Sequence, residues 1–309
     1  MPKIHVTRSV DIHAAPEKVH SLINNFNAWQ AWSPWLIADP EATVKVAADG
    51  KSYAWEGPVT GAGEMEIEAE DSGNIHCNLL FLKPFKSKAK TYFTLDKTAS
   101  GTRLTWVMDS SIPFFMFWMK NSMQVYIGMD YDRGLLMIKD LAEKETVLSS
   151  LEFMGQHAFS PTHYIAISNS CPIDELPQHM SKNYEALLSY VHDKNSAAEQ
   201  QGHAFSMYHR WDPVKGEVRY TACVPLKKIP ESLPEEFSVG ELPTLQVYGV
   251  RHKGAYRHLG NAWSAVMMHE RSKKFKSHKK YAGMEVYVNS PQDTKEPDLV
   301  SEILIPVRD

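Results

Sequence analysis

The sequence has few cysteines, and they form no recognisable pattern. Its 309 residues include only Cys77, Cys171 and Cys223, an odd number without a CxxC pair. Disulfide frameworks and zinc knuckles need paired, closely spaced cysteines, so the pattern argues against both. We expect three small, half-buried side chains in a reducing compartment, and the expected location is the cytoplasm.

Long apolar segments are also missing. The most apolar run, 112–119 (IPFFMFWM), is far shorter than the ~20 residues that a membrane-spanning helix needs. The N-terminal stretch MPKIHVTRSVDIHAAP contains neither the apolar core nor the cleavage pattern of a secretory signal. We therefore expect no membrane span and no signal peptide.

Neither sign of charge dominates. Lysine and arginine number 33 against 37 acidic residues, a net charge of −4, which gives no overall attraction to nucleic acid. No helix-turn-helix is recognisable, so we expect no specific nucleic-acid binding. A solvated helix end is the simplest interpretation of the one basic cluster, and a docking patch for an anionic protein partner is the alternative. The cluster contains Lys273, Lys274, Lys276, Lys279 and Lys280.

Motifs for metal binding, cofactor binding and nucleophilic catalysis are absent too. Fourteen histidines occur without an HxxxH or HExxH pattern. His203 and His209 share a strand face, but they lie roughly 20 Å apart on an extended chain, too far for one ion. No GxSxG, P-loop or strand-linked GxGxxG is present. We expect no metal and no cofactor, and we interpret Glu56 and Asp109 as solvated or hydrogen-bonded strand residues.

The first half of the chain has the pattern of one α+β domain. Residues 3–12 alternate as a strand, and Pro16 opens a short helix. From 42 to 108, short β-rich runs alternate with turn residues, which is typical of an antiparallel meander. Residues 121–151 then carry apolar side chains at helical spacing. The long helix is expected to fill the concave face of the sheet.

The second half contains an internal repeat of a strand-helix-strand-strand unit. The strands are expected at 162–168, 203–210 and 217–226, then again at 244–252, 283–289 and 301–307. The repeats end similarly, with CVPL at 223–226 and LIPV at 304–307. A linker is expected at 152–160. A crevice where two such units meet is a natural ligand site.

Glu285 is the most informative residue of this half. It lies between Met284 and Val286 in an interior-strand pattern, and period-2 alternation places Tyr287 on the same face. A carboxylate in such a place is costly unless it is paired, and a bound cation among aromatic rings would offset that cost. The alternative is a structural Glu that bonds a neighbouring Tyr or Arg, or faces water. Glu302, nearer the chain end, is interpreted as structural.

Both halves resemble known families. The motifs DIHAAPEKV, WxxWSPW (29–35), YAWEG, GxGEM, LKPF, GTRLTW and GLLMIKDLAEKE resemble the START/polyketide-cyclase-like (SRPBCC) superfamily. The segments around Tyr208-His209, CVP at 223–225, HKGAY at 252–256, Glu285-Val-Tyr287 and EILIPV at 302–307 resemble the gyrase-inhibitor-like (GyrI-like) family and the effector-binding domains of bacterial transcription activators.

These resemblances imply a fold and a site. The fold class is α+β, with a helix-grip START-like domain at 1–153 and a duplicated strand-helix-strand-strand GyrI-like domain at 158–309. The second resemblance implies a central pocket with a buried acid. The acid is then Glu285, and the candidate aromatic walls are Tyr208, Tyr256, Trp263 and Tyr287.

We therefore expect a small-molecule-binding protein that senses or sequesters amphipathic or cationic ligands, a regulator-like effector-binding protein without its own DNA-binding domain. One alternative is a hydrolase or cyclase of a reactive small molecule with Glu285 as general base. The other is a gyrase-modulating protein-interaction module. Binding is favoured over catalysis because no nucleophile–base pair is recognisable, and other catalytic residues are unknown.

Overall fold

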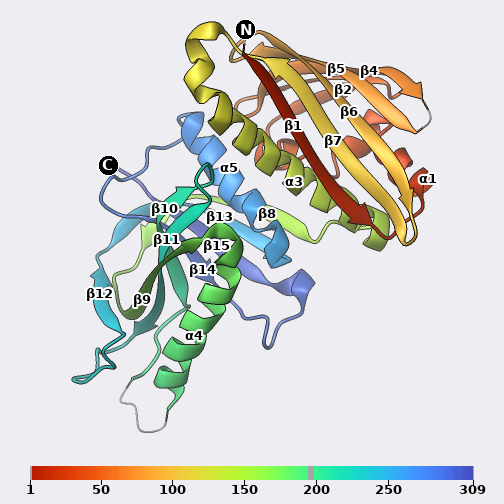
Figure 1. Cartoon of the computed structure of the whole chain (residues 1–309). Coiled ribbons are helices and arrows are strands. Elements are labelled where there is room, and N and C mark those ends of the chain that lie inside the picture. Colours follow the sequence, from red (N-terminus) through yellow and green to blue (C-terminus); the bar gives the residue numbers. More distant parts are fainter. Residues whose placement is uncertain (1, 72, 194–197, 309) are drawn as a thin grey trace. The chain divides into compact units, whose positions relative to one another are not determined.

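The computed structural model describes residues 2–71, 73–193 and 198–308 (Figure 1). The chain divides into two compact units. One unit comprises Met1–Ser150 together with Met267–Ser272, and the other comprises Leu151–Val266 together with Lys273–Asp309. All three cysteines are free and buried. Among the described residues, no helix is long and apolar enough to cross a membrane.

The first unit is built on an antiparallel sheet with the strand order β1-β7-β6-β5-β4-β3-β2. The expected N-terminal strand and the meander are thereby confirmed. The strands are β1 (Lys3–Ile12), β2 (Thr43–Val46), β3 (Ser52–Gly57), β4 (Gly61–Asp71), β5 (Asn74–Lys83), β6 (Ser87–Thr98) and β7 (Gly101–Ser111).

Short helices precede the meander and one long helix follows it. They are α1 (Pro16–Ser21), α2 (Phe26–Trp29), η1 (Leu36–Ala38), η2 (Phe114–Met119) and α3 (Lys120–Lys144). The helix expected at 121–151 is confirmed, but its expected end is wrong. It ends at Lys144, where the next residue, Glu145, adopts a left-handed conformation (φ 61°). Leu148 lies beyond the helix, where its N–H donates to the Asp140 carboxylate (3.3 Å).

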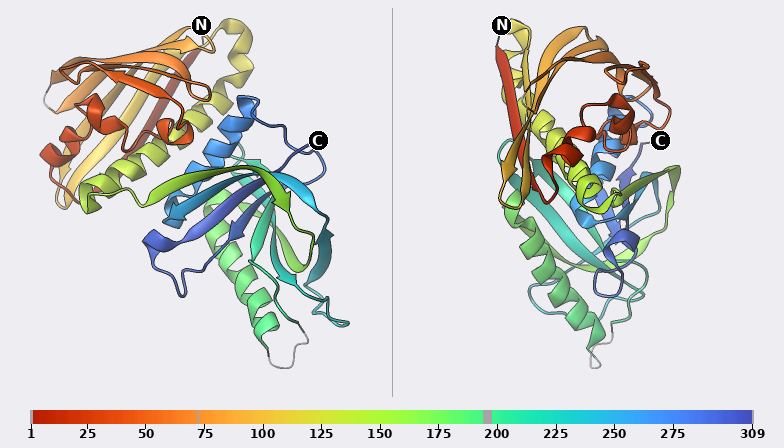
Figure 2. Two further views of the ribbon diagram at one scale, coloured as in Figure 1. Left: turned by 180° about the vertical axis from the view of Figure 1, so that it is seen from behind. Right: turned by 90° about the vertical axis from the view of Figure 1, so that its right-hand side faces the viewer.

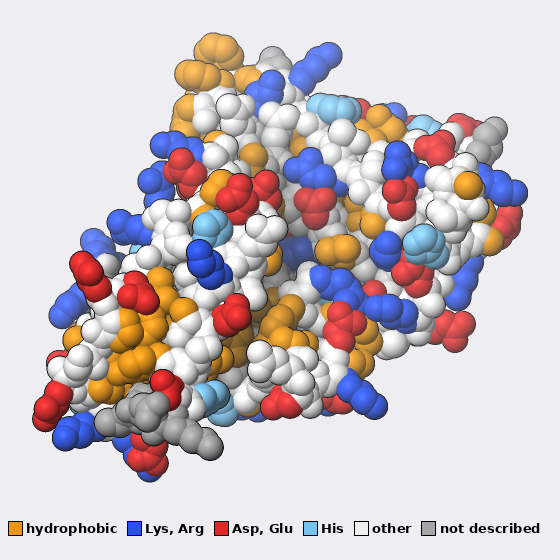
Figure 3. All heavy atoms as spheres, turned by 60° about the horizontal axis from the view of Figure 1, so that its bottom comes forward, with side chains coloured by type: hydrophobic (Ala, Val, Ile, Leu, Met, Phe, Trp, Pro, Cys, Tyr) orange, Lys and Arg blue, Asp and Glu red, His pale blue; other side chains and the backbone are white. Residues whose placement is uncertain are grey.

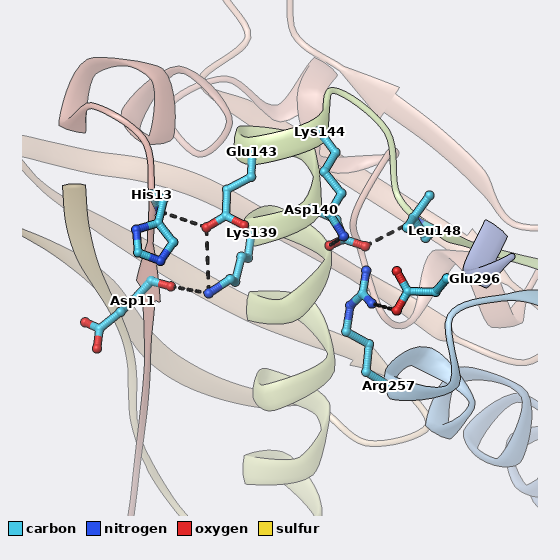
Figure 4. A network of polar contacts seen from close by, with 9 residues as sticks. All are labelled: Asp11, His13, Lys139, Asp140, Glu143, Lys144, Leu148, Arg257 and Glu296. Atoms are coloured by element: carbon cyan, nitrogen blue, oxygen red, sulfur yellow. Dashed lines mark hydrogen bonds and ion pairs between the residues drawn. The ribbon is translucent and has the colours of Figure 1, made fainter. Parts of the chain in front are cut away.

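Polar contacts hold the last turns of α3 to β1 and its neighbouring turn, as Figure 4 shows. Lys139 donates to the carbonyl oxygen of Asp11 (2.6 Å), and the N–H of His13 donates to the Glu143 carboxylate (2.7 Å). These contacts fix α3 across the sheet.

Aromatic side chains fill the space between α3 and the sheet. Trp29, Trp32 and Trp106 are at most 2% exposed. Trp106 stacks on Tyr131 of α3, with ring centroids 3.8 Å apart. Gly134 permits this approach, because a Cβ there would lie 2.8 Å from the Trp106 ring. This part of the helix grip is therefore packed core.

The second unit is an eight-stranded sheet with the order β12-β9-β11-β10-β14-β15-β13-β8 (Figure 2). Its strands are β8 (Ser149–Phe159), β9 (Thr162–Pro172), β10 (Phe205–Asp212), β11 (Glu217–Leu226), β12 (Ser238–Leu242), β13 (Leu245–Gly254), β14 (Gly283–Tyr287) and β15 (Val300–Pro306). Its helices are η3 (Ile173–Glu175), α4 (Leu176–His192), η4 (Tyr256–His258), α5 (Gly260–Arg271) and η5 (Glu296–Asp298), although the end of α5 from Met267 on is grouped with the first unit.

The duplicated unit is confirmed, with β9-α4-β10-β11 followed by β13-α5-β14-β15. The linker expected at 152–160 is wrong, because this segment belongs to β8 and extends the sheet beyond β13. Leu151 and Phe153, two residues apart on one strand face, pack against the apolar core near α5. Gly155, with φ 67°, interrupts the alternation that would identify the strand.

We predict that fragments 1–150 and 151–309 fold separately, because each contains its own sheet and apolar core. A fragment 160–309 lacks β8 and leaves β13 at an open edge. Its melting temperature should therefore fall by about 5 °C or more relative to 151–309. Circular dichroism melts of the three fragments test this. An unfolded 1–150 or 151–309, or equal melting of 151–309 and 160–309, would contradict it.

Candidate functional site

The two helices α4 and α5 frame the centre of the second sheet. The core near α4 includes residues of β9 and β11, and the core near α5 includes residues of β13 and β15. Because β10 and β14 pair in the middle of the sheet, their helix-facing side chains lie between the two helices. These side chains are Ser206, Tyr208, Glu285 and Tyr287.

The strand register shows that the site lies on the pseudo-twofold relation between the repeats. In β10, Phe205 pairs with Cys223 of the CVPL segment, and in β14, Met284 pairs with Leu304 of the LIPV segment. Phe205 and Met284 are therefore equivalent, and 79 residues separate them. With the same spacing, Ser206 is equivalent to Glu285.

Ser206 and Glu285 are also direct partners in the antiparallel ladder. A residue pair that is both equivalent and opposite marks the local symmetry axis. Tyr208 is equivalent to Tyr287, two residues further along each strand. The candidate site is therefore the place where the two repeats meet.

Glu285 is held by neutral hydrogen-bond donors. Glu285 is buried, with only 5% of its surface exposed. The indole Nε1 of Trp263 donates to Oε2 (2.6 Å), and the hydroxyl of Tyr287 donates to Oε1 (2.6 Å). Among the residues that the structure describes, no lysine, arginine or histidine forms an ion pair with this carboxylate.

Aromatic rings surround the carboxylate in two equivalent edge-to-face pairs. Tyr208 meets Trp263 with ring centroids 5.2 Å apart and planes at 80°, and Tyr184 meets Tyr287 at 5.5 Å and 84°. The spacing of 79 residues also relates Tyr184 of α4 to Trp263 of α5. Tyr256 lies further out, 6.2 Å from the Tyr287 ring.

The electrostatic environment disfavours charge on the carboxyl group. Burial raises the pKa of Glu285, and hydrogen bonds from Trp263, Tyr287 and Tyr208 only partly oppose the rise. Burial, together with the nearby carboxylate, raises the pKa of Tyr287 and Tyr208 well above their ordinary value. The tyrosines therefore stay protonated as donors near neutral pH.

Of the residues that the resemblance implied, Glu285, Tyr287, Tyr208 and Trp263 lie together, with Tyr256 at the edge of the group. Sequence reasoning missed Tyr184 and Ser206, whose hydroxyl groups lie 2.8 Å apart. The 79-residue spacing that relates them to Trp263 and Glu285 comes from the strand register, because the CVPL and LIPV segments begin 81 residues apart in the sequence.

Gly283 is a third residue that the sequence analysis missed. A Cβ there would lie 2.8 Å from Ile305 and 3.3 Å from the Trp263 ring. The glycine therefore lets the indole lie against β14, on the strand face that carries Glu285.

Other candidate residues have structural surroundings. Glu302 forms an ion pair with Arg251 (2.8 Å), as expected of a structural acid. His252 and His258 are buried, and burial, with His258 nearby, lowers the pKa of His252 to about 4. Within the described ranges, no three His, Cys, Asp or Glu residues cluster as metal ligands.

The basic cluster begins at the end of α5 and continues through the loop to β14. Lys273, Lys276, Lys279 and Lys280 are exposed, whereas Lys274 is half-buried. The ammonium of Lys280 lies 5.1 Å from the ring centroid of Tyr281. On the face shown in Figure 3, basic and acidic side chains are interspersed.

An open hollow of about 1300 Å³ lies along the sheet of the first unit. Asp109 lines the hollow and bonds His5 (2.7 Å). Glu56 forms an ion pair with Lys83 (2.6 Å). Both acids are therefore hydrogen-bonded strand residues, as expected.

Fold and site define an α+β protein in which a helix-grip unit precedes a duplicated unit with a carboxylate on its symmetry axis. Residues 158–308 match the GyrI-like small molecule binding domain, and residues 3–143 match the family described as polyketide cyclase / dehydrase and lipid transport. The chain thus carries a polyketide-cyclase-like domain followed by a GyrI-like small-molecule-binding domain, in the predicted order.

Solved structures are similar to about half of this chain at low identity. The EcmrR C-terminal domain is 15% identical over 52% of this chain and 99% of its own length, with a TM-score of 0.42. A putative bacterial transcription regulation protein from Staphylococcus aureus MU50 is 14% identical over 51% and 99% (TM-score 0.37), and SAV2435, solved with tetraphenylphosphonium, is 14% identical over 51% and 94% (TM-score 0.38). The comparison with curated proteins gives no match.

We predict that Glu285→Gln stabilises the protein increasingly as pH rises. Because the native pKa lies above the ordinary value of 4.5, the native state binds this proton more tightly than the unfolded chain. Wild-type stability therefore falls as pH rises from the ordinary pKa through the native one, and the Gln variant lacks this loss. Its amide can still accept from Trp263.

Urea unfolding of both proteins from pH 4.5 to pH 8 measures the difference. As a control, Glu302→Gln removes one partner of Arg251 and should lower stability. A difference between wild type and Glu285→Gln that stays constant with pH would refute the prediction.

Proposed function

We propose that the second unit binds hydrophobic organic cations at Glu285, and that it senses or sequesters such molecules. The observation that carries the proposal is a carboxylate on the symmetry axis that is 5% exposed and held by neutral donors. Removing a carboxylate from water is costly, and neutral donors offset only part of that cost. A cation that enters the site would supply the missing charge.

The chemistry of the surroundings favours a particular kind of cation. Tyr184, Tyr208, Trp263 and Tyr287 supply π faces and apolar area around the carboxylate. A cation with delocalised or shielded charge loses little hydration on entry, and aromatic faces attract it by cation–π interaction. Small inorganic cations, by contrast, would have to exchange strongly held water for a few oxygens.

The rings are packed against each other in the unbound protein, so the proposal includes a movement. Edge-to-face pairs such as Tyr208–Trp263 must separate for a bulky ligand to reach Glu285. Both residues are half-buried rather than fully enclosed. A change in Trp263 fluorescence on binding is the expected sign of this step.

We predict that Glu285→Gln weakens binding of tetraphenylphosphonium by roughly fivefold to 150-fold, equivalent to about 1–3 kcal/mol for a lost charged interaction. Affinity for triphenylphosphine oxide, a neutral molecule of related shape, should change much less. Isothermal titration calorimetry of both ligands with wild type and Glu285→Gln measures the coupling between the charge of the ligand and that of Glu285.

The matched control is Glu302→Gln, which removes a carboxylate from the neighbouring strand β15, where it pairs with Arg251. This variant should bind the cation as the wild type does. Equal loss in both variants, or no loss in Glu285→Gln, would argue against a specific role for Glu285.

The binding of the cation should also depend on pH. Because burial raises the pKa of Glu285, part of the population is protonated at mildly acidic pH, and a cation must displace that proton. Affinity should therefore rise with pH up to the native pKa and then level off. Calorimetry at pH 5 in two buffers of different ionisation enthalpy should detect proton release, and Glu285→Gln should show none.

A second candidate function is hydrolysis of a reactive small molecule with Glu285 as general base. The raised pKa of Glu285 favours it, because a general base works best when its pKa lies near the operating pH. In this case Glu285→Gln abolishes turnover and spares the affinity for a neutral substrate. Kinetic assays with electrophilic esters or epoxides separate the two functions.

A further inference from the structure

The turn between β7 and α3 exposes four aromatic side chains in succession. Phe114, Phe115, Phe117 and Trp118 of η2 are 76%, 75%, 59% and 70% exposed. Scattered apolar residues are normal on a protein surface, but a contiguous set of this size marks an interaction site.

The three-residue period of the 3₁₀ helix explains this exposure. Side chains three positions apart lie above one another, so η2 has three ridges. Phe114 and Phe117 form one ridge, with ring centroids 5.9 Å apart, and Phe115 and Trp118 form the second. Met116 leads the third ridge and packs against the core of the first unit. Two ridges of aromatic rings therefore face outward.

A fifth aromatic side chain lies at the same end of the sheet. Ala89 near the start of β6 pairs with Ser110 near the end of β7. The β5–β6 turn and the start of η2 therefore lie at the same end of these strands. Phe85 in that turn is 78% exposed. We call Phe85, Phe114, Phe115, Phe117 and Trp118 the aromatic tip.

Several basic residues adjoin the aromatic tip. Lys86 and Lys88 follow Phe85, and Lys3 pairs through the backbone with Ser111 at the end of β7. All three are exposed. Lys120 begins α3, whose first turn has no acidic residue, so the positive end of its helix dipole faces the same region.

We infer that the aromatic tip docks on an anionic lipid surface. Aromatic rings inserted at the level of the headgroups bury apolar area, while the adjacent lysines remain at the charged boundary. The positive potential complements anionic headgroups, and each lysine near such a surface adds favourable binding energy.

The shape and charge of the tip favour lipid over a protein partner. A rigid partner covers one side of a helix, whereas η2 exposes aromatic rings on two of its three ridges. A fluid headgroup layer can surround both ridges and Phe85 together. A second copy of this chain would bring the same lysines face to face, which like-charge repulsion opposes.

The test is co-sedimentation of the full chain with vesicles of phosphatidylcholine, with and without 30% phosphatidylglycerol. Binding should require the anionic lipid and weaken in 0.5 M salt. Serine at Phe114, Phe115, Phe117 and Trp118 should lower partitioning at least about tenfold. Lys86→Glu with Lys88→Glu should produce a similar loss.

Matched controls lie in the other unit. Trp211→Ser removes an aromatic side chain that is 44% exposed, and Lys182→Glu with Lys215→Glu reverses two exposed charges. Both should bind vesicles as the wild type does. Brominated lipid should quench part of the fluorescence of wild type, and this part should vanish in Trp118→Phe, which still binds.

Several outcomes would overturn the inference. One is wild-type protein that stays in the supernatant with anionic vesicles, and another is a serine variant that binds equally well. A third is a concentration-dependent dimer, seen by analytical ultracentrifugation without lipid and abolished by the serine changes, which would make the aromatic tip a self-association surface.

Discussion

A single buried carboxylate constrains the centre of the second unit. Glu285 lies in the middle of an eight-stranded sheet, where neither edge nor loop brings water to it. Its neighbours must therefore donate hydrogen bonds, and Trp263 and Tyr287 do so. Gly283 leaves room for the indole beside the strand. The requirement to satisfy one carboxyl group thus constrains residues of one strand, β14, and one helix, α5.

The duplication explains why only one acid occupies this place. Ser206 and Glu285 are equivalent in the two repeats and directly opposite in the ladder, with Cβ atoms about 4.5–5.5 Å apart in such pairs. Two carboxylates at that distance in an apolar interior would repel, and one would stay protonated. A serine avoids this conflict and bonds Tyr184 instead. The site keeps the symmetry of its rings but not of its charge.

Much of the fold could be predicted because alternation and helical spacing are local properties. The strands of both repeats and the face shared by Glu285 and Tyr287 follow from parity alone. β8 escaped prediction because Gly155 interrupts its alternation, and β12 is too short to show a pattern. Both are edge strands of the sheet, β8 pairing with β13 and β12 with β9.

The site was predictable only in part because its contacts are not local. The sequence suggested an acid and four rings, but it gave no sign that Trp263 is a donor to Glu285 or that the rings pack edge to face. Tyr184 contributes from a helix far from Glu285 in the sequence. Its equivalence to Trp263 can be recognised only when the strand register gives the 79-residue spacing between the repeats. The sequence alone does not show which strand residues pair.

In the aromatic run at 112–119, the type of helix determines which side chains face the core and which face solvent. With 3.6 residues per turn, four aromatic residues and two methionines would be spread around the helix. With three residues per turn, Met116 faces the core and the aromatic rings occupy the other two ridges. Trp29, Trp32 and Trp106 form the packed core of the first unit, and the four aromatic rings of η2 lie outside that core. In water they stay hydrated at a cost in free energy, and an apolar phase beside the lysines is the environment that removes this cost.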